Sequence, residues 1–434
     1  MKAALKRWLI VTKDRIRYSS VLQCLAGFAL TLRGVFTRPL AAKLDLYAKA
    51  FRLLVPRDRA GWITARLSPY VEDAERVEIW RRSHVVSGSD GSSLDEFEIS
   101  KGLLLKPYRG PKEKGVLMIS FEYNWLPLLS LSRRDTLFDR YALICAPSWS
   151  PPPFPAIWSM AGLKNADVFV MQSNFREADW YNRLPTNVSP LPLLISHWIH
   201  PDFYQPQPFE EREIDILMVA NWAVFKRQWV LFRALQELPR DFRVVLVGQP
   251  DSGRTMEHIE AEAEAFGVRD RIEIRERLGI DEVTSLQCRS KTSLVFSRRE
   301  GSCVVVAESM FADCPVGLLQ GAHIGSSAFV NEHTGVMLNE SNLATELQDF
   351  VERAGSFSAR EWAMKNISCF RSAELMNRHL REWNEARGNV WTQDVLPFMC
   401  RPNPMYVAPD AEAQMAAAYQ DLRSECGVSV RGHT

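Results

Sequence analysis

The sequence lacks a hydrophobic run long enough to span a lipid bilayer as one helix. Its longest uncharged stretch, residues 18–32, is interrupted by serine, glutamine and threonine and is shorter than the ~20 apolar residues that a spanning helix needs. The amino terminus also lacks the small-residue cleavage site of a secretory signal. These absences predict a cytoplasmic protein whose membrane contact, if it has any, is peripheral.

Cysteines are few and scattered along the chain. The eight cysteines form no C-x-x-C pair and no dense framework, which argues against a disulfide scaffold and against a zinc site. We expect reduced, mostly buried thiols. The sequence also has no internal repeat and no low-complexity tract, and its formal net charge of +1 gives no sign of a nucleic-acid partner.

Positive charge is concentrated at the amino terminus. Residues 1–59 contain thirteen lysines and arginines and three aspartates, a net charge of about +10. Apolar residues between these cations predict helices with a basic face and an apolar back. Such helices fit two interpretations. They lie peripherally on an anionic membrane, at its inner face, or they form an extension packed on the rest of the chain with its charges solvated.

The remaining chain is long enough for two domains and is 46% hydrophobic. Short apolar runs at 116–121, 142–145 and 168–171 predict strands buried in a parallel sheet. After residue 200 we expect strands at 214–220, 242–248, 271–274 and 293–297, with helices at 228–238, 256–266 and 281–288. The predicted domains are a basic helical extension (1–60), two α/β domains (61–200 and 201–385) and a tail with a helix (386–434).

The stretch from 292 to 319 carries the clearest chemical signal. A hydrophobic strand ends at Ser297, Glu300 and Gly301 follow, and an apolar run continues until it stops at residues 313–315. Three consecutive valines favour a strand, whereas the good helix cap Ser302 and the length of the run favour a helix. If the run is a helix, its amino terminus is an anion site suited to a diphosphate. Glu308 would then lie about 6 Å further along, within reach of a ribose.

This stretch resembles the E-x7-E signature of retaining glycosyltransferases, particularly glycosyltransferase family 4. Glu300-Gly301, Glu308 and Pro315-Val316 stand at the positions of that signature, after Ser297. Residues 200–206 (HPDFYQP), 214–226 and 331–338 (NEHTGVML) resemble further family stretches in the family's order. The resemblance covers about residues 195–350. It implies a GT-B fold, α/β, in which two Rossmann-like domains face a cleft, with the amino-terminal domain taking the acceptor and the carboxyl-terminal domain the donor.

By this resemblance, Lys226 neutralises the donor diphosphate, Glu300 contacts the transferred sugar or its phosphate, and Glu308 binds the ribose. No D-x-D motif occurs, so no metal is expected. The family's Gly-Arg before the lysine is replaced by Ala220-Asn221, which removes one cation, and an arginine at 227, 298 or 299 would have to replace it. The predicted donor-binding residues are therefore Glu308, Gly301, Ser302, Cys303, Asn221, Arg227 and Gly248.

The implied activity is transfer of a hexosyl-type sugar, with retention, from a UDP- or GDP-sugar to a glycan or lipid-linked acceptor, as in surface polysaccharide or glycolipid synthesis. Glu122, His197 and Trp149 are candidate acceptor-side residues. His197 and Trp149 also fit purely structural roles, and Glu122 also fits a turn cap. The altered lysine motif keeps a second hypothesis open, a catalytically degenerate protein that binds sugar nucleotides or serves as a partner subunit. An epimerase or phosphorylase of the same architecture is a third.

Overall fold

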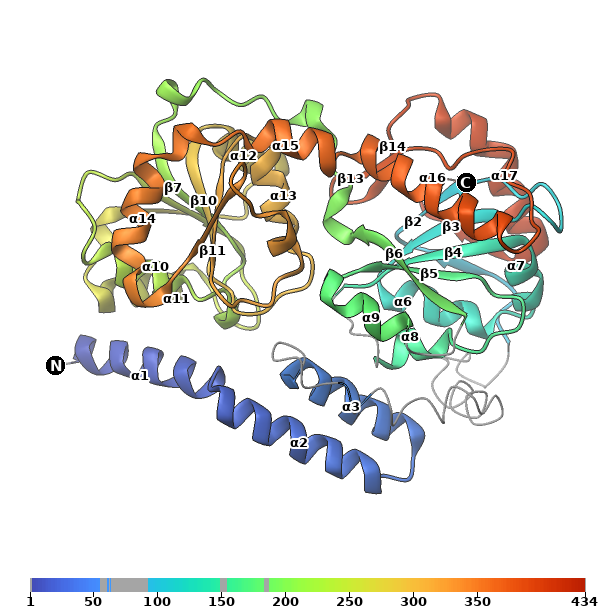
Figure 1. Ribbon diagram of the computed structural model, residues 1–434, viewed down its shortest axis with the longest axis horizontal. Helices are drawn as coiled ribbons and strands as arrows, with labels where there is room; N and C mark the ends of the chain where they lie inside the picture. Colours follow the sequence, from blue (N-terminus) through green and yellow to red (C-terminus); the bar gives the residue numbers. More distant parts are fainter. Residues whose placement is uncertain are drawn as a thin grey trace. The chain divides into compact units, whose positions relative to one another are not determined.

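The computed structural model describes residues 2–54, 61, 63, 93–148, 154–182 and 187–433 (Figure 1). The chain divides into two compact units, each made of segments distant in sequence. The first unit comprises Met1–Leu22 and Ile199–Ser368, and the second Gln23–Trp198 and Cys369–Thr434. The break after Trp198 lies close to the predicted one at residue 200. The units do not separate at the predicted breaks at 60 and 385. The chain on both sides of each of these positions belongs to the second unit.

The first unit is built on a six-stranded sheet in which all neighbours are parallel. Its strands are β7 (Ile214–Val219), β8 (Val244–Gly248), β9 (Ile272–Glu276), β10 (Ser290–Val295), β11 (Val316–Leu319) and β12 (Gly335–Leu338). The order is β12-β11-β10-β7-β8-β9. The four strands expected after residue 200 are thereby confirmed. Their apolar runs are largely buried, as expected for a sheet covered on both faces.

Helices connect these strands: α10 (Gln228–Leu235), α11 (Met256–Phe266), α12 (Ile280–Cys288) and α13 (Val304–Phe311). Helices α14 (Leu343–Glu352) and α15 (Ala359–Asn366) follow the last strand, β12. Helix α11 has the predicted bounds, and it ends at Gly267, whose φ of 71° is a left-handed conformation that glycine adopts without strain. The valine run that sequence alone left undecided is the start of helix α13. Burial of Val306, Met310 and Phe311 on one side of this helix overrides the β-propensity of the valines.

The chain opens with three helices, α1 (Lys2–Arg17), α2 (Ser20–Phe36) and α3 (Leu40–Leu54), so the helical character predicted for this region is confirmed over its described residues. Helix α1 packs on α11 of the first unit, where Lys6 Nζ donates to the carbonyl of Ala261 at 2.8 Å. Among the described helices, none is by itself both long and apolar enough to cross a membrane. Only α1 and α2 taken together meet those criteria, with a bend of 47° at the break between them.

The second unit contains a five-stranded sheet of β2 (Gly102–Lys106), β3 (Gly115–Ser120), β4 (Tyr141–Ala146), β5 (Val168–Gln172) and β6 (Val188–Leu194). β2 is antiparallel to β3, and the other pairs are parallel. The three strands predicted before residue 200 correspond to β3, β4 and β5. The strands lie side by side in chain order, β2 to β6. Among the described strands of this sheet, the order therefore does not reverse.

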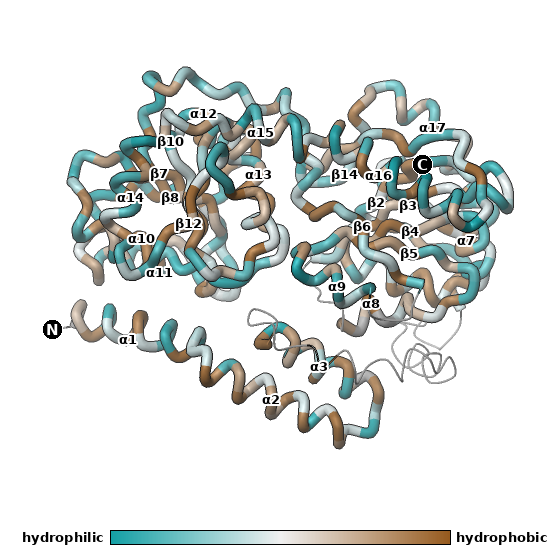
Figure 2. The backbone as a smooth tube through the Cα atoms, viewed as in Figure 1, coloured by the Kyte–Doolittle hydropathy of each residue, from teal (hydrophilic) through white to brown (hydrophobic). Residues whose placement is uncertain are grey.

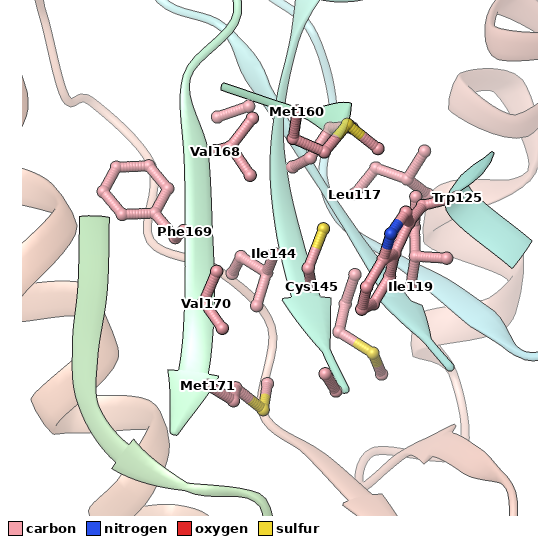
Figure 3. Close-up of a cluster of buried hydrophobic side chains, with 14 of the residues drawn as sticks. Leu117, Ile119, Trp125, Ile144, Cys145, Met160, Val168, Phe169, Val170 and Met171 are labelled. Carbon is pink, nitrogen blue, oxygen red and sulfur yellow. The ribbon is translucent and has the colours of Figure 1, made fainter. Parts of the chain in front are cut away.

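The core of the second unit lies on both faces of this sheet. On one face, the Trp125 indole is fully buried and donates to the carbonyl of Ala156 at 3.3 Å. Figure 3 shows this indole beside Ile119 and Cys145. Phe169 of β5 meets Trp383 of α16 (Cys369–Glu385) edge to face, with the ring centroids 5.1 Å apart. A helix that follows the first unit in sequence thus completes the core of the second.

The predicted tail is an integral part of the second unit. It forms β13 (Phe398–Cys400), β14 (Pro404–Tyr406), α17 (Ala411–Cys426) and β15 (Val428–Val430), and β15 pairs with β1 (Phe97–Ile99) in parallel. Two buried tyrosines join it to β2. The Tyr406 hydroxyl donates to the carbonyl of Leu104 at 2.6 Å, and the Tyr419 hydroxyl accepts from the amide of Leu104 at 3.1 Å. The helix predicted near 411–423 is confirmed as α17.

Candidate functional site

The strand order of the first sheet reverses between β7 and β10. From β7 the chain proceeds to β8 and β9 on one side, and from β10 to β11 and β12 on the other. In open parallel sheets, ligands bind outside the carboxyl ends of the strands at such a reversal, because the loops of the two central strands diverge there. The loops in question are residues 220–227 after β7 and residues 296–303 after β10.

These two loops are joined by an ion pair. Lys226 Nζ lies 2.7 Å from Glu300 Oε2, and the two side chains are 15% and 10% exposed. Burial by itself would lower the pKa of Lys226, but the Glu300 carboxylate outweighs it and holds the pKa above its usual value. The lysine is therefore a fixed cation at the reversal point. The predicted pair Lys226 and Glu300 is brought together by the fold.

Helix α13 begins directly after this pair. Gly301 and Ser302 are buried, and Cys303, not Ser302 as expected, is the N-cap residue, with a left-handed φ of 42°. Such a conformation is strained for a residue other than glycine and is typical of functional loops. Burial and the neighbouring Glu300 carboxylate raise the pKa of the Cys303 thiol well above its usual range, so this cysteine is a neutral group and not a nucleophile.

Glu308 lies one helical turn beyond Val304, about 6 Å along the axis of α13. It is half-buried on an otherwise mostly apolar helix. The amino terminus of α13 presents backbone N–H groups and a partial positive charge, which attract an anion. The structure thus places a cation beside the amino terminus of a helix that carries a second carboxylate one turn further along. Among the described residues there is no group of three or more histidine, cysteine or acidic side chains that could hold a metal ion.

Asn221 connects the loops that follow β7 and β8. Its side-chain amide donates to Asp251 Oδ2 at 2.6 Å, and its backbone carbonyl accepts from Gln228 Nε2 at 2.8 Å. The residue braces the loop that carries Lys226 and brings no charge to it. It therefore does not replace the missing cation of the family motif.

Gly248, the last residue of β8, packs against the same loop. A Cβ at this position would lie 2.4 Å from the carbonyl oxygen of Ala220 and 2.6 Å from the ring of Trp222. Gly248 was predicted to contact the donor. The structure shows in addition that this position has no room for a side chain, because the loop after β7 packs directly against the end of β8.

Replacing Gly248 by alanine should therefore displace the loop that holds Lys226. We expect a loss of about 1–3 kcal/mol in the free energy of unfolding, as for other overpacked sites, measured by urea denaturation. Gly279→Ala is a suitable control, since a Cβ at Gly279 meets nothing closer than 3.4 Å. Equal stability losses in the two variants would contradict this view of Gly248.

Arg227 differs from its predicted role as a second diphosphate cation. Its side chain is fully buried, and its guanidinium is bonded to Asp14 of α1 at 2.9 Å and to Glu340 at 3.0 Å. The carbonyl of Phe296 accepts a further bond at 3.2 Å. A buried guanidinium held by two carboxylates is not available to a diphosphate. Arg298 is also paired with Glu340, at 2.5 Å. One feature of the sequence hinted at this arrangement, since Asp14 is the only acid among the first 44 residues.

The acceptor-side candidates lie in the second unit. Glu122 follows β3 and begins α6 (Glu122–Trp125), where its Oε1 accepts from the backbone amide of Ser148 at 3.1 Å. It therefore links the loops after β3 and β4. The preceding Phe121 has a strained φ of 64°. Trp149 lies outside the described residues.

His197 does not fit the predicted contact with an acceptor. It is 4% exposed, and its Nδ1 accepts from the backbone amide of Leu194 at 2.9 Å. Burial lowers the pKa of His197 to about 4, so the ring is neutral and caps a short turn. Its role is structural.

The buried His197 predicts a specific acid sensitivity. Its pKa is below the ordinary value of 6.5, so the unfolded chain takes up a proton that the folded chain does not. Stability from this group is complete above pH 6.5 and falls as the pH drops towards 4. We expect a loss of about 2 kcal/mol by pH 5, measured by urea unfolding. In His197→Asn, whose amide oxygen can still accept from Leu194, this part of the pH dependence should disappear. The same pH slope in both proteins would contradict the assignment.

Several solved structures are similar to this chain. HepE from Anabaena, in complex with UDP, is 14% identical with a TM-score of 0.48, covering 62% of this chain and 78% of that one. Sucrose-phosphate synthase from Thermosynechococcus elongatus is 17% identical with a TM-score of 0.48, covering 62% and 74%. WaaG, a glycosyltransferase involved in lipopolysaccharide biosynthesis, is 19% identical with a TM-score of 0.36, covering 54% and 64%. These likenesses are too distant to transfer the role of any residue.

No curated protein matches the chain in sequence. A family model does match, and it spans residues 213–354, which run from the start of β7 to the end of α14. Its description is glycosyl transferases group 1. The matched segment contains Lys226, Glu300 and Glu308, and it includes both loops at the reversal of strand order. The match covers about a third of the chain, and it lies within the first unit.

Proposed function

We propose that this protein is a retaining glycosyltransferase, similar to family 4, that moves a hexosyl-type sugar from a UDP- or GDP-sugar to a glycan or lipid-linked acceptor. The observation that carries the proposal is the Lys226–Glu300 pair at the reversal of strand order, directly before helix α13. A nucleoside diphosphate has the charge and length to lie along this edge. HepE from Anabaena was solved with UDP, which motivates the choice of nucleotide to test first.

In this proposal the diphosphate replaces Glu300 as the partner of Lys226. The bond between the anomeric carbon and the phosphate oxygen breaks, and its electron pair stays with the leaving diphosphate. Lys226 and the amino terminus of α13 stabilise that growing negative charge. The acceptor hydroxyl oxygen bonds to the anomeric carbon on the same face, and its proton passes to the leaving phosphate oxygen. Glu300, released from the lysine, accepts hydrogen bonds from the transferred sugar, and Glu308 accepts them from the ribose.

One observation favours the second candidate, a degenerate sugar-nucleotide-binding or partner subunit. The loop after β7 has a neutral Asn221 in place of a cation, and Arg227 is engaged by Asp14 and Glu340. Lys226 is then the cation of this loop that faces the site. The resulting loss of charge stabilisation would weaken catalysis more than binding, since the charge on the phosphate grows during transfer.

A nucleotide panel followed by a turnover assay separates the two candidates. We expect UDP or GDP to raise the melting temperature, and we expect the matching nucleotide sugar to be hydrolysed slowly in the absence of acceptor. Glu300→Gln should abolish that hydrolysis. Stabilisation by a nucleotide without turnover on any acceptor would support the binding subunit. A protein that no nucleoside diphosphate stabilises would contradict both candidates.

A further inference from the structure

Helix α2 presents large apolar side chains to solvent along one face. Val21, Leu25, Leu32 and Phe36 are 65%, 61%, 59% and 78% exposed. Their spacings of four, seven and four residues place them on a single stripe of a helix with 3.6 residues per turn. Figure 2 shows the hydrophobic colour along much of α2. We call these four residues the apolar face of α2.

The opposite side of α2 is small and polar, and it is the side that packs. Its buried residues are Gln23, Cys24, Gly27, Thr31 and Gly34. A Cβ added at Gly27 would lie 2.7 Å from Leu54, and one at Gly34 would lie 2.5 Å from Tyr47, so α3 approaches α2 at these glycines. A surface helix of a water-soluble protein has the reverse polarity, with large apolar residues inward. Small residues inward and large apolar residues outward are typical of a helix that faces lipid.

Helix α1 has an apolar face of the same kind, flanked by cations. Leu5, Trp8 and Ile16 are 57%, 60% and 57% exposed. The exposed charged residues near these apolar faces, from residue 3 to residue 40, include Lys6, Lys13, Arg15, Arg33 and Arg38. The single acid of that stretch, Asp14, is buried in its ion pair with Arg227. Every exposed charged residue from residue 3 to residue 40 is therefore positive.

We propose that α1 and α2 dock on the surface of a bilayer that contains anionic lipids, with their apolar faces in the interface and their cations against the lipid headgroups. A helix with an apolar face bordered by lysine and arginine binds such a surface in two ways: its apolar side chains leave water, and its cations are attracted to the anionic headgroups. Helix α1 lies in the interface and does not span the bilayer, because the Lys6–Ala261 hydrogen bond and the Asp14–Arg227 ion pair fix it to the folded first unit. A second copy of the chain is a less suitable occupant, since two such surfaces would bring like charges together.

The docking surface is tested by co-sedimentation of the full chain with vesicles. We expect binding to vesicles of phosphatidylcholine with phosphatidylglycerol and much weaker binding to phosphatidylcholine alone. The variant L25E/L32E should reduce binding to the anionic vesicles at least tenfold, because two apolar side chains no longer leave water. The matched control is M364E/M405E, which adds the same charge at exposed methionines of α15 and β14. It should bind as the wild type does.

A second variant tests the charge contribution without changing an apolar side chain. R15Q/R33Q alters two exposed arginines and should weaken binding to anionic vesicles about fivefold for each cation removed. Vesicle binding is expected whether or not sugar transfer occurs, so its failure is distinguishable from failure of the proposed function. A wild type that ignores anionic vesicles overturns the proposal, as does undiminished binding by L25E/L32E. If L25E/L32E instead converts a dimer to a monomer with vesicle binding unchanged, the apolar face belongs to a second copy.

Discussion

Replacing Lys226 by alanine is expected to lower kcat/KM for sugar transfer or donor hydrolysis by about 10²–10³. The reason is that Lys226 is buried and held as a cation at the end of β7, where the proposed leaving diphosphate gains charge as its bond to the sugar breaks. Removing one pre-positioned group that stabilises developing charge typically costs that much. Release of UDP or GDP from the nucleotide sugar measures the effect directly.

Lys365→Ala is the matched control for this prediction. Lys365 is a lysine of the same unit, 69% exposed, and its partner Glu361 lies one turn away on α15. It should retain full activity. Donor affinity should fall less than the rate in Lys226→Ala, because the charge on the diphosphate is larger in the transition state than in the bound donor. A Lys226→Ala enzyme within threefold of wild type would rule out the assigned role.

The second large effect is on stability. Arg227→Met removes the cation that the buried Asp14 shares with the half-buried Glu340, at the point where α1 meets the first unit. Glu340 keeps its pair with Arg298, so the loss falls mainly on Asp14. Breaking a buried ion pair by removing one partner typically costs 3–5 kcal/mol, and we expect about that loss in the free energy of unfolding. Urea denaturation monitored by tryptophan fluorescence measures it.

Arg240→Met provides the comparison, because Arg240 pairs with Asp270 at the surface, where the two side chains are 72% and 66% exposed. Its loss should be below about 1 kcal/mol. If Arg227→Met were no more destabilising than Arg240→Met, the pair with Asp14 would not be an anchor for α1. Since Arg227 adjoins Lys226, a displaced loop in this variant should also weaken nucleotide binding.

Much of the first unit was predictable because its signals are local. Helix α11 begins after Thr255 and ends at a glycine, so its bounds can be read from neighbouring residues. The strands β7 and β8 are apolar runs of the expected length, and the E-x7-E spacing singled out Glu300 and Glu308 as candidate site residues. The Lys226–Glu300 contact also follows from topology, because parallel strands end at one edge of the sheet.

The failures involve partners distant in sequence. Arg227 was expected to face a diphosphate, but its partner Asp14 lies 213 residues earlier and no local pattern connects them. His197 was a candidate both for an acceptor contact and for a structural role, and its burial, which a short stretch of sequence does not show, selects the structural role. The tail was expected to be separate, yet Tyr406 and Tyr419 bond to Leu104, about 300 residues away. The identity of the α13 N-cap also depended on backbone geometry, since Cys303 adopts a strained left-handed φ.

Titration calorimetry with nucleotides tests the central claim most directly. The claim is that the edge formed by Lys226, Glu300 and the start of α13 holds a nucleoside diphosphate. We predict that UDP or GDP binds the wild type, that the corresponding nucleoside binds far more weakly, and that Lys226→Ala removes most of this difference. Equal affinity for nucleoside and nucleoside diphosphate, or an unchanged diphosphate affinity in Lys226→Ala, would contradict the account.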